Sequence, residues 1–199
     1  MEAVGAIYLV RHGETEWNRE GRLQGQSNSA LTKRGLKQAH GIGMLLRQLI
    51  GAGDGIPIIA SPLERALRTA EAICGPLGRD PARLPTDDLL KEISFGRWEG
   101  MTFAEIAAAD PGNWRRLEQD RWNFAPPGGE SYAMMAERVR QWLHDSSVIR
   151  EKIVVAHGEF GRVLRGIYRG MSPEEMFALD VPQDVVFRLS AGTIERIGA

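Results

Sequence analysis

The chain has 199 residues, of which 43% are hydrophobic and 26% are charged, and its formal net charge is −1. These values are typical of a globular protein with a substantial core, so we expect a single domain over residues 1–199. The near-neutral charge gives no indication of a nucleic-acid or membrane partner. Any attraction for an anionic substrate must therefore come from arginine and lysine side chains gathered at one place.

Cys74 is the only cysteine, which excludes an intrachain disulfide and argues against a cysteine-based zinc site. The N-terminal residues, MEAVGAIYLVRHG, lack the basic segment and the long apolar run of a signal peptide. No stretch approaches the roughly 18 apolar residues of a membrane span. We therefore expect a soluble, cytoplasmic protein, and the sequence leaves its oligomeric state open.

The first half of the chain alternates between short apolar runs and helical patterns. Residues 6–10, AIYLV, are apolar on both faces and predict a covered parallel strand. A helix is predicted over 32–50, with Thr32 as its N-cap. PIIA, at 57–60, predicts a second buried strand. A helix should follow, with Ser61 able to cap it, proline at its first position and Gly75 beyond its end.

The second half continues the same alternation. Residues 153–156, IVVA, predict a third buried strand, followed by a helix to about Arg169. SPEE at 172–175 has the form of a capping box. VVFRLS and TIERI, separated by an Ala-Gly pair, predict a terminal antiparallel hairpin. The expected fold is an α/β three-layer sandwich, with a mainly parallel, mixed central sheet between helices.

Residues 95–130 interrupt this alternation. They are rich in tryptophan, phenylalanine, glycine and proline, and contain only short helical stretches. We expect an excursion over one end of the sheet, where open α/β folds often place substrate selectivity.

Three segments share one pattern, in which a buried strand is followed by a polar turn and a helix. Arg11 and His12 follow the first strand, Arg65 lies one turn into the helix after the second, and His157 follows the third. The carboxyl ends of parallel strands meet at one crevice. Two arginines and two histidines beside helix N-termini would attract an anion, and a phosphoryl group suits arginine forks best.

The chemistry of phosphoryl transfer suggests roles for these side chains. A neutral imidazole, that of His12, can attack phosphorus and carry the group covalently. The leaving alkoxide needs a proton donor, for which Glu92, after another strand-like run, is the candidate. Because an ordinary glutamic acid is ionised at neutral pH, Glu92 would need burial or mildly acidic conditions. Glu99 is the other candidate for this proton donor.

Several motifs, in this order, together resemble the histidine phosphatase superfamily, also called the phosphoglycerate mutase-like family. The resemblance covers residues 7 to about 169, nearly the whole chain. The motifs are RHGETEWN, GRLQGQSNSALTKRG, SPLERALRTA, EISFGRWEG, PPGGES and AHG.

The resemblance implies a role for each matching residue. His12 would be the phosphorylated nucleophile, Arg11, Arg65 and His157 would hold the phosphoryl group, and Glu92 would act as general acid and then base. The resemblance implies further pocket or phosphate contacts from Gly13, Asn18, Gln24, Gly25 and Gly158. It implies no metal and no cofactor.

The family contains mutases and phosphatases. The short insertion before His157 and the Ile-Ser-Phe-Gly that follows Glu92 resemble the phosphatase branch, and the surroundings of Arg115 and Arg116 do not match the arginine pair of mutases. We therefore expect hydrolysis of a small phosphomonoester. The alternatives are a mutase-type phosphotransferase, a phosphatase acting on phosphorylated protein, and a non-hydrolytic phosphate-binding protein. The physiological substrate stays open.

Two features leave the shape of the pocket open. Glu159 occupies a position where the family commonly has a small, apolar or amide residue, and its charge would repel phosphate unless it points away or pairs with Arg162. The aromatic residues of the excursion can form either a core or a binding wall. They are Phe95, Trp98, Trp114, Trp122 and Phe124.

Overall fold

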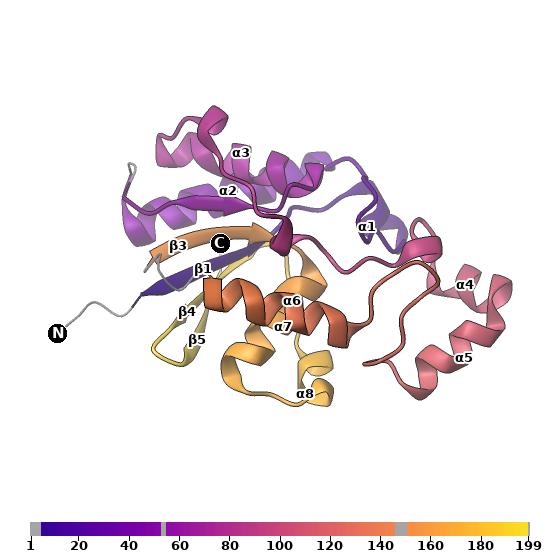
Figure 1. Cartoon of the computed structure of the whole chain (residues 1–199). Helices are drawn as coiled ribbons and strands as arrows, with labels where there is room; N and C mark the ends of the chain where they lie inside the picture. The colour runs from indigo at the N-terminus through magenta and orange to yellow at the C-terminus, as the bar shows by residue number, and fades with distance from the viewer. Residues whose placement is uncertain (1–4, 53–54, 146–150, 199) are drawn as a thin grey trace.

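The computed structural model describes residues 5–52, 55–145 and 151–198, so residues 1–4 of the N-terminal segment considered above lie outside it. It contains a five-stranded sheet between layers of helices, as Figure 1 shows. This confirms the predicted α/β sandwich. The strands are β1 (Ala6–Arg11), β2 (Ile58–Ala60), β3 (Glu151–Ala156), β4 (Val185–Ser190) and β5 (Thr193–Gly198).

The strand order is β2-β3-β1-β4-β5. β3 lies at the centre of the parallel part, with β2 and β1 parallel to it on either side. β4 runs antiparallel to β1, and β5 antiparallel to β4, which confirms the terminal hairpin. The carboxyl ends of β1, β2 and β3 therefore lie side by side at one edge of the sheet.

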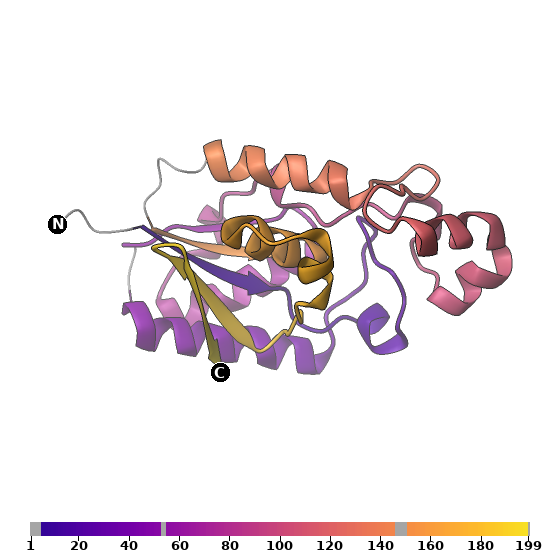
Figure 2. The same cartoon turned by 90° about the horizontal axis from the view of Figure 1, so that it is seen from below.

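Helices cover both faces of the sheet. α2 and α3 lie on one face, and α6 and α7 lie on the other, as Figures 1 and 2 show. The helices are α1 (Glu16–Glu20), α2 (Lys33–Ile50), α3 (Glu64–Leu77), α4 (Phe103–Ala109), α5 (Pro111–Gln119), α6 (Tyr132–Asp145), α7 (Gly158–Arg169) and α8 (Pro173–Ala178). Short 3₁₀ turns occur at Pro81–Arg83, Asp88–Leu90 and Gly96–Trp98.

The strands are apolar on both sides because both faces of the sheet are covered. In β1, Tyr8 and Val10 belong to the core under α2 and α3, whereas Leu9 belongs to the core under α6 and α7. Each large apolar side chain buried in this way stabilises the fold by about 1.5–3 kcal/mol. The sheet is thus anchored from both sides, which holds its carboxyl edge in place.

The helix caps predicted around 32–50 and 172–175 are confirmed. Thr32 accepts a hydrogen bond from the backbone N–H of Gly35 at 2.9 Å. At α8, Ser172 and Glu175 form the reciprocal capping box.

The prediction for the helix after β2 was wrong at both ends. α3 begins at Glu64 rather than at the proline, and Ser61 does not cap it, because its hydroxyl is engaged elsewhere. Gly75 lies inside the helix. The left-handed residue that ends it is Gly78, whose N–H bonds to the carbonyls of Cys74 and Gly75.

The strand-like run before Glu92 is not a strand of the sheet. It touches the edge of β2 at one parallel bridge, between Ala60 and Thr86. The chain then turns, because the carboxylate of Asp87 accepts from the N–H of Leu89 and starts a 3₁₀ turn. This turn carries the chain across the carboxyl edge of the sheet.

Residues 95–130 lie beyond the carboxyl ends of the parallel strands, where α4 and α5 project from the sheet (Figures 1 and 2). Trp98, Ile106 and Phe124 form a small core there, separate from the two cores of the sheet. Residues 95–130 therefore extend past one end of the sheet, and their part in substrate selectivity stays a prediction. Across the described residues, no helix combines the length and apolar character of a membrane span.

Candidate active site

The predicted site residues meet at the carboxyl edge of the sheet. His12 follows β1 and His157 follows β3, and their ring centroids are 5.3 Å apart although 145 positions separate them. Backbone hydrogen bonds extend the sheet past the strand ends, from the N–H of His12 to Ala156 and from the N–H of Ser61 to Val155. The turns that begin at His12 and at Ser61 are therefore held by the sheet itself.

The surroundings of His12 keep its imidazole neutral and fix its orientation. Nδ1 lies 2.8 Å from the carbonyl oxygen of Gly13, which can only accept, so Nδ1 carries the proton. Nε2 then bears the lone pair, and the Nε–H of Arg65 points at it from 3.2 Å. Burial lowers the pKa of His12 well below its ordinary value, and the charges of Arg65 and Arg11 lower it further. The result is a buried, neutral imidazole whose Nε2 bears a lone pair.

Arg65 lies on the first turns of α3 and is almost fully buried, with 1% of its surface exposed. Besides His12, its guanidinium donates to the carbonyls of Ser27, at 2.8 Å, and Gly25, at 2.6 Å. Burial lowers its pKa to about 10, which still leaves it charged at neutral pH. A fixed positive charge thus lies beside the nucleophilic nitrogen.

His157 is oriented by Ser61 rather than by a carboxylate. The Ser61 hydroxyl lies 2.7 Å from His157 Nε2 and 3.4 Å from the N–H of Leu63. Accepting from this backbone N–H leaves the Ser61 oxygen a second lone pair, so the hydroxyl can donate to Nε2 or accept from it; where it donates, Nδ1 carries the imidazole proton. Burial, together with the charge of Arg65, lowers the pKa of His157. Ser61 is thus a functional candidate that the sequence analysis read only as a helix cap.

Three of the predicted site residues hold polar atoms without a partner. Among the described residues, four buried side-chain atoms lack one: Arg11 Nε, His157 Nδ1, Gln24 Oε1 and Trp142 Nε1. Such atoms are rare in folded proteins and call for an explanation. Arg11 ends β1 directly before His12, and His157 follows the neighbouring strand β3. Arg11 Nε is a donor, and His157 Nδ1 is one when Ser61 donates to Nε2. Together with Arg65 they form a buried set of donors suited to an oxyanion.

Glu92 is buried against the N-terminus of α7. Its carboxylate accepts from the backbone N–H groups of Glu159, at 3.1 Å, Phe160, at 2.9 Å, and Ile93, at 3.1 Å. Burial raises the pKa of Glu92, and the charge of Glu159 raises it further. The charge of Arg65 and the two helical N–H groups oppose this rise. Glu92 is therefore a carboxyl group with a raised proton affinity, buried at the N-terminus of α7.

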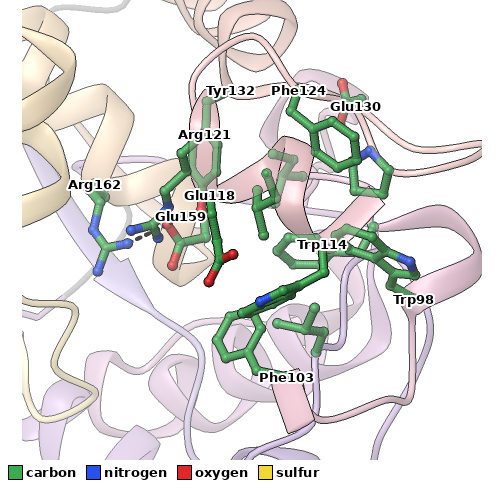
Figure 3. Close-up of a pocket in the computed structure, with 15 residues that line it drawn as sticks. Trp98, Phe103, Trp114, Glu118, Arg121, Phe124, Glu130, Tyr132, Glu159 and Arg162 are labelled. Atoms are coloured by element: carbon green, nitrogen blue, oxygen red, sulfur yellow. Dashed lines mark hydrogen bonds and ion pairs between the residues drawn. The ribbon is translucent and has the colours of Figure 1, made fainter. Parts of the chain in front are cut away.

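The charge of Glu159 is compensated within the protein. Its Oε2 accepts from Arg162, at 2.5 Å, and from the hydroxyl of Tyr132, at 2.9 Å. The ion pair with Arg162 that the sequence analysis considered is therefore present. Figure 3 shows both side chains together at the edge of a cavity. This pairing reduces the repulsion that a carboxylate would exert on a bound anion.

Glu99 is the alternative to Glu92 as the proton donor. Its carboxylate is bonded to the loop at residues 26–27 and to the segment that follows Glu92. It accepts from the backbone N–H groups of Gln26 and Phe95 and from the hydroxyl of Ser27. The positive φ of Gly25, +53°, suits only glycine here, and a Cβ would lie 2.2 Å from the Glu99 carboxylate. Glu99 thus holds together the loop whose carbonyls receive Arg65.

The remaining predicted contacts lie around the same centre. Gly13 donates its N–H to Thr69, and a Cβ on Gly158 would lie 3.2 Å from Arg11 Nε. Asn18 completes the capping box of α1 by accepting from the N–H of its N-cap Thr15, and its Oδ1 also accepts from Gln183, at 2.9 Å.

Sequence reasoning missed Gln183. Its Nε2 also donates to the backbone carbonyl of His12, at 3.3 Å, and so links the nucleophile loop to α1. The only signal was a polar residue just before β4, which pairs with β1.

A cavity of about 540 Å³ adjoins the site on the side of Glu92. Ile93 and Glu159, whose backbone N–H groups donate to Glu92, are among its lining residues. Figure 3 shows Phe103 and Trp114 on the side of the cavity across from Glu159. Neither Arg115 nor Arg116 lines it.

The described residues contain no group of three or more histidine, cysteine, aspartate or glutamate side chains that could hold a metal ion. The positive groups at the site are arginines.

Several relatives share this sequence pattern. The sequence profile of the histidine phosphatase superfamily (branch 1) matches residues 7–192. The bifunctional protein Rv2228c of Mycobacterium tuberculosis is 36% identical over 186 residues, which are 92% of this chain and 46% of that protein. The chain thus spans about half the length of that relative. The “Probable phosphoglycerate mutase GpmB” of Erwinia tasmaniensis is 40% identical over 157 residues, covering 76% of this chain and 69% of that protein.

Solved structures have the same fold. The α-ribazole phosphatase of Shigella flexneri superposes with a TM-score of 0.82 at 24% identity, covering 98% of this chain and 96% of that one. A mycobacterial glucosyl-3-phosphoglycerate phosphatase, Rv2419c, in complex with VO3, superposes with a TM-score of 0.78 at 26% identity, covering 92% and 90%. With a profile match over nearly its whole length, the chain belongs to the histidine phosphatase superfamily (branch 1).

Proposed function

We propose that the chain is a phosphomonoesterase that hydrolyses a small phosphorylated metabolite through a phosphohistidine on His12. The observation that carries this proposal is the pair of unpartnered donors, Arg11 Nε and His157 Nδ1, gathered with Arg65 around a neutral histidine. A phosphoryl group supplies the acceptor oxygens that these donors lack. The structure of Rv2419c with VO3, an oxyanion, supports the same reading for a related fold.

In the first step, the lone pair of His12 Nε2 attacks phosphorus in line with the leaving oxygen. Arg11, Arg65 and His157 donate to the equatorial oxygens, where negative charge is spread in the transition state. As the P–O bond breaks, its electron pair stays on the leaving oxygen, and Glu92 transfers its proton there. The alcohol leaves, and the phosphoryl group remains on His12.

In the second step, water attacks the phosphohistidine. Glu92, now a carboxylate, accepts the proton from that water while the P–N bond breaks and returns its electron pair to Nε2. Inorganic phosphate leaves, and both His12 and Glu92 are restored to their starting forms. The cycle consumes only ester and water, and the arginines supply the positive charge that other phosphatases take from metal ions.

A mutase-type transfer to a second alcohol is the alternative, and relatives named as phosphoglycerate mutases keep it open. Arg115 and Arg116 are exposed on α5 and line no part of the cavity. They are therefore not placed to bind a second phosphorylated substrate there. This observation favours water as the acceptor.

The test is release of p-nitrophenol from p-nitrophenyl phosphate between pH 5 and pH 8 in the presence of EDTA. We expect turnover by the wild type and a loss of more than about a thousandfold in His12→Ala. The control is His144→Ala, which removes an exposed histidine on α6 and should keep full activity.

Circular dichroism should show the same fold for all three proteins. Equal turnover by wild type and His12→Ala, or loss of turnover in EDTA, would overturn the proposal. Phosphoryl transfer to added alcohols in place of water would establish the mutase alternative instead.

A further inference from the structure

We infer that Thr69 and Gln183 are positioning residues for the nucleophile, because they hold the peptide group between His12 and Gly13 from both ends and so aim the ring of His12. Neither side chain lines the cavity beside Glu92, and we assign neither a contact with the substrate. The expected effect on turnover rests on the proposed function, whereas the expected effect on the ring rests on the hydrogen bonds alone.

The two hydrogen bonds fall on the same peptide group. The N–H of Gly13 donates to the hydroxyl of Thr69 at 3.0 Å. The carbonyl of His12 accepts from the side-chain amide of Gln183 at 3.3 Å. A trans peptide group is planar, and its N–H and C=O point to opposite sides. Hydrogen bonds at both ends therefore fix how this plane is turned.

The hydroxyl of Thr69 is committed to this contact. Thr69 lies on α3 with 1% of its surface exposed, and its hydroxyl donates to the carbonyl of Arg65 at 2.7 Å. Because its only proton is used there, its oxygen faces the N–H of Gly13 as an acceptor. Thr69 thus ties the loop of the nucleophile to the turn of α3 that carries Arg65, whose Nε–H points at His12 Nε2.

The amide of Gln183 is oriented by two oxygens. Its nitrogen donates to the carbonyl of His12 and to Oδ1 of Asn18. Oδ1 is fixed as an oxygen because it also accepts from the N–H of Thr15 at 3.2 Å. Only the nitrogen of an amide can donate, so Gln183 meets the nucleophile loop as a donor.

The segment before Gln183 is held by three arginines. The carbonyls of residues 179, 180 and 181 accept, in that order, from Arg162, Arg165 and Arg11. Arg165 is 4% exposed, so this anchor is shielded from water. The amide of Gln183 therefore extends from a fixed backbone, and its hold on the loop does not depend on a mobile segment.

The next peptide group holds the ring itself. Its carbonyl, that of Gly13, lies 2.8 Å from His12 Nδ1, and its N–H, that of Glu14, donates to Gln38 at 2.9 Å. If the first plane turns, the Gly13 carbonyl and the ring that it holds move with it. Because the attacking atom must lie in line with the leaving oxygen, a displacement of about 1 Å can cost about a hundredfold in rate.

Turnover measures the aim of the ring. We expect Thr69→Val, which keeps the shape of the side chain and removes its hydroxyl, to lower kcat with p-nitrophenyl phosphate about thirtyfold. KM should change by less than about twofold, because the donors to the phosphoryl group remain. Thr69→Ser restores the hydroxyl and should come within about threefold of the wild type. An unchanged kcat in Thr69→Val, or equal losses in both variants, would overturn the inference. Thr193→Val, exposed in β5, is the control.

Gln183→Met keeps the length of the side chain and removes the amide. The position is half-buried and belongs to none of the apolar cores, so this variant folds even if Thr69→Val does not. We expect kcat to fall about tenfold. Gln48→Met, exposed on α2, is the control. A Gln183→Met protein with the kcat of the wild type would contradict the inference.

The double variant tests whether the two residues hold one group. Residues that act on a shared rigid group are coupled, so the loss in Thr69→Val/Gln183→Met should differ from the product of the single losses by at least about threefold. A double loss equal to that product would show two independent effects and would overturn the shared hold on one peptide group.

The ring can also be observed without turnover. In protein that carries isotope-labelled histidine, the Nδ1–H proton of His12 gives a magnetic resonance signal that is absent from His12→Ala. We expect this proton to exchange with water at least about tenfold faster in Thr69→Val and in Gln183→Met, because its carbonyl partner is no longer held. The same exchange rate in wild type and both variants would overturn the inference.

This measurement separates the inference from the proposed function. If no ester is hydrolysed but exchange of the His12 proton is faster in both variants, the proposed function fails and the positioning role stands. If esters are hydrolysed but kcat and proton exchange are the same in wild type and variants, the positioning role fails alone.

Discussion

The carboxyl edge of the sheet and the excursion over 95–130 differ in how their side chains are held. At the sheet edge, His12 and Arg65 are buried and bonded to backbone and to one another, and His157 is buried and bonded to the hydroxyl of Ser61. In the excursion, Phe103 is half exposed and packs against Trp114, beside a core separate from those of the sheet. One region is fixed by the sheet, and the other by its own small core and by the bonds of Glu99 to the loop at residues 26–27.

This difference matches the two tasks that we expect of these regions. Phosphoryl transfer needs groups held within fractions of an ångström, which only elements anchored on both faces can supply. Selection of a leaving group needs apolar contact, which tolerates variation in shape. Glu92 lies between the two regions, since both α7 and the cavity lining contact it.

Replacing the proton-donating carboxyl of Glu92 is, after the loss of His12, the change with the largest expected effect on turnover, and the effect should depend on the leaving group. We expect Glu92→Gln to lower kcat/KM about a hundredfold or more for alkyl esters, and far less for p-nitrophenyl phosphate, whose leaving group needs no proton. Glu137→Gln, at an exposed position on α6, should lower neither. Equal losses for both kinds of ester would show that Glu92 acts through structure and not as an acid.

Ser61→Ala tests the sheet edge alone. Without its hydroxyl, His157 Nε2 is left unpaired and the ring is no longer oriented, so kcat/KM should fall about tenfold. Because we expect no contact between the leaving group and Ser61, the loss should be the same for alkyl phosphates with small and with large leaving groups. Ser190→Ala, in the terminal hairpin, is the control. A loss that depended on the size of the leaving group would mean that Ser61 contacts the leaving group and not only His157.

Glu159→Gln tests whether the cavity lining acts on the sheet edge. The charge of Glu159 raises the pKa of Glu92, so its removal lowers that pKa. Glu92 acts in its protonated form, and the rate with alkyl esters falls as pH rises through its pKa. The alkaline limb should therefore move to lower pH, with kcat/KM at pH 8 lower by about threefold.

The pH profile is what separates electrostatics from structure in that variant. A purely structural role for Glu159 would lower the rate by the same factor at every pH. Glu174→Gln, exposed on α8, should leave the profile in place.

The parts of the molecule that could be predicted are those that local sequence determines. The apolar run at β1 and the Thr32 cap of α2 depend on neighbouring residues only, and both are confirmed. The convergence of His12 and His157 followed from the rule for parallel strands, and their ring separation agrees with it.

The parts that could not be predicted depend on contacts between distant segments. Ser61 has the form of a helix cap, and only the proximity of His157, 96 positions away, gives its hydroxyl another partner. Gln183 lies 171 positions from the carbonyl it binds. Most of the aromatic residues of the excursion line the cavity, and only packing shows that Trp98 and Phe124 are also buried in its small core.

The loop that carries His12 approaches the backbone of α2 closely at Gly13. A Cβ added to Gly13 would lie 2.3 Å from the carbonyl oxygen of Gly35 in the first turn of α2, and one added to Gly35 would lie 2.1 Å from that of Glu14. Main chain touching main chain leaves no side chain between them that could change rotamer. The first turn of α2 therefore fixes the backbone of the loop at Gly13, so a side-chain change in the core beneath should move His12 little.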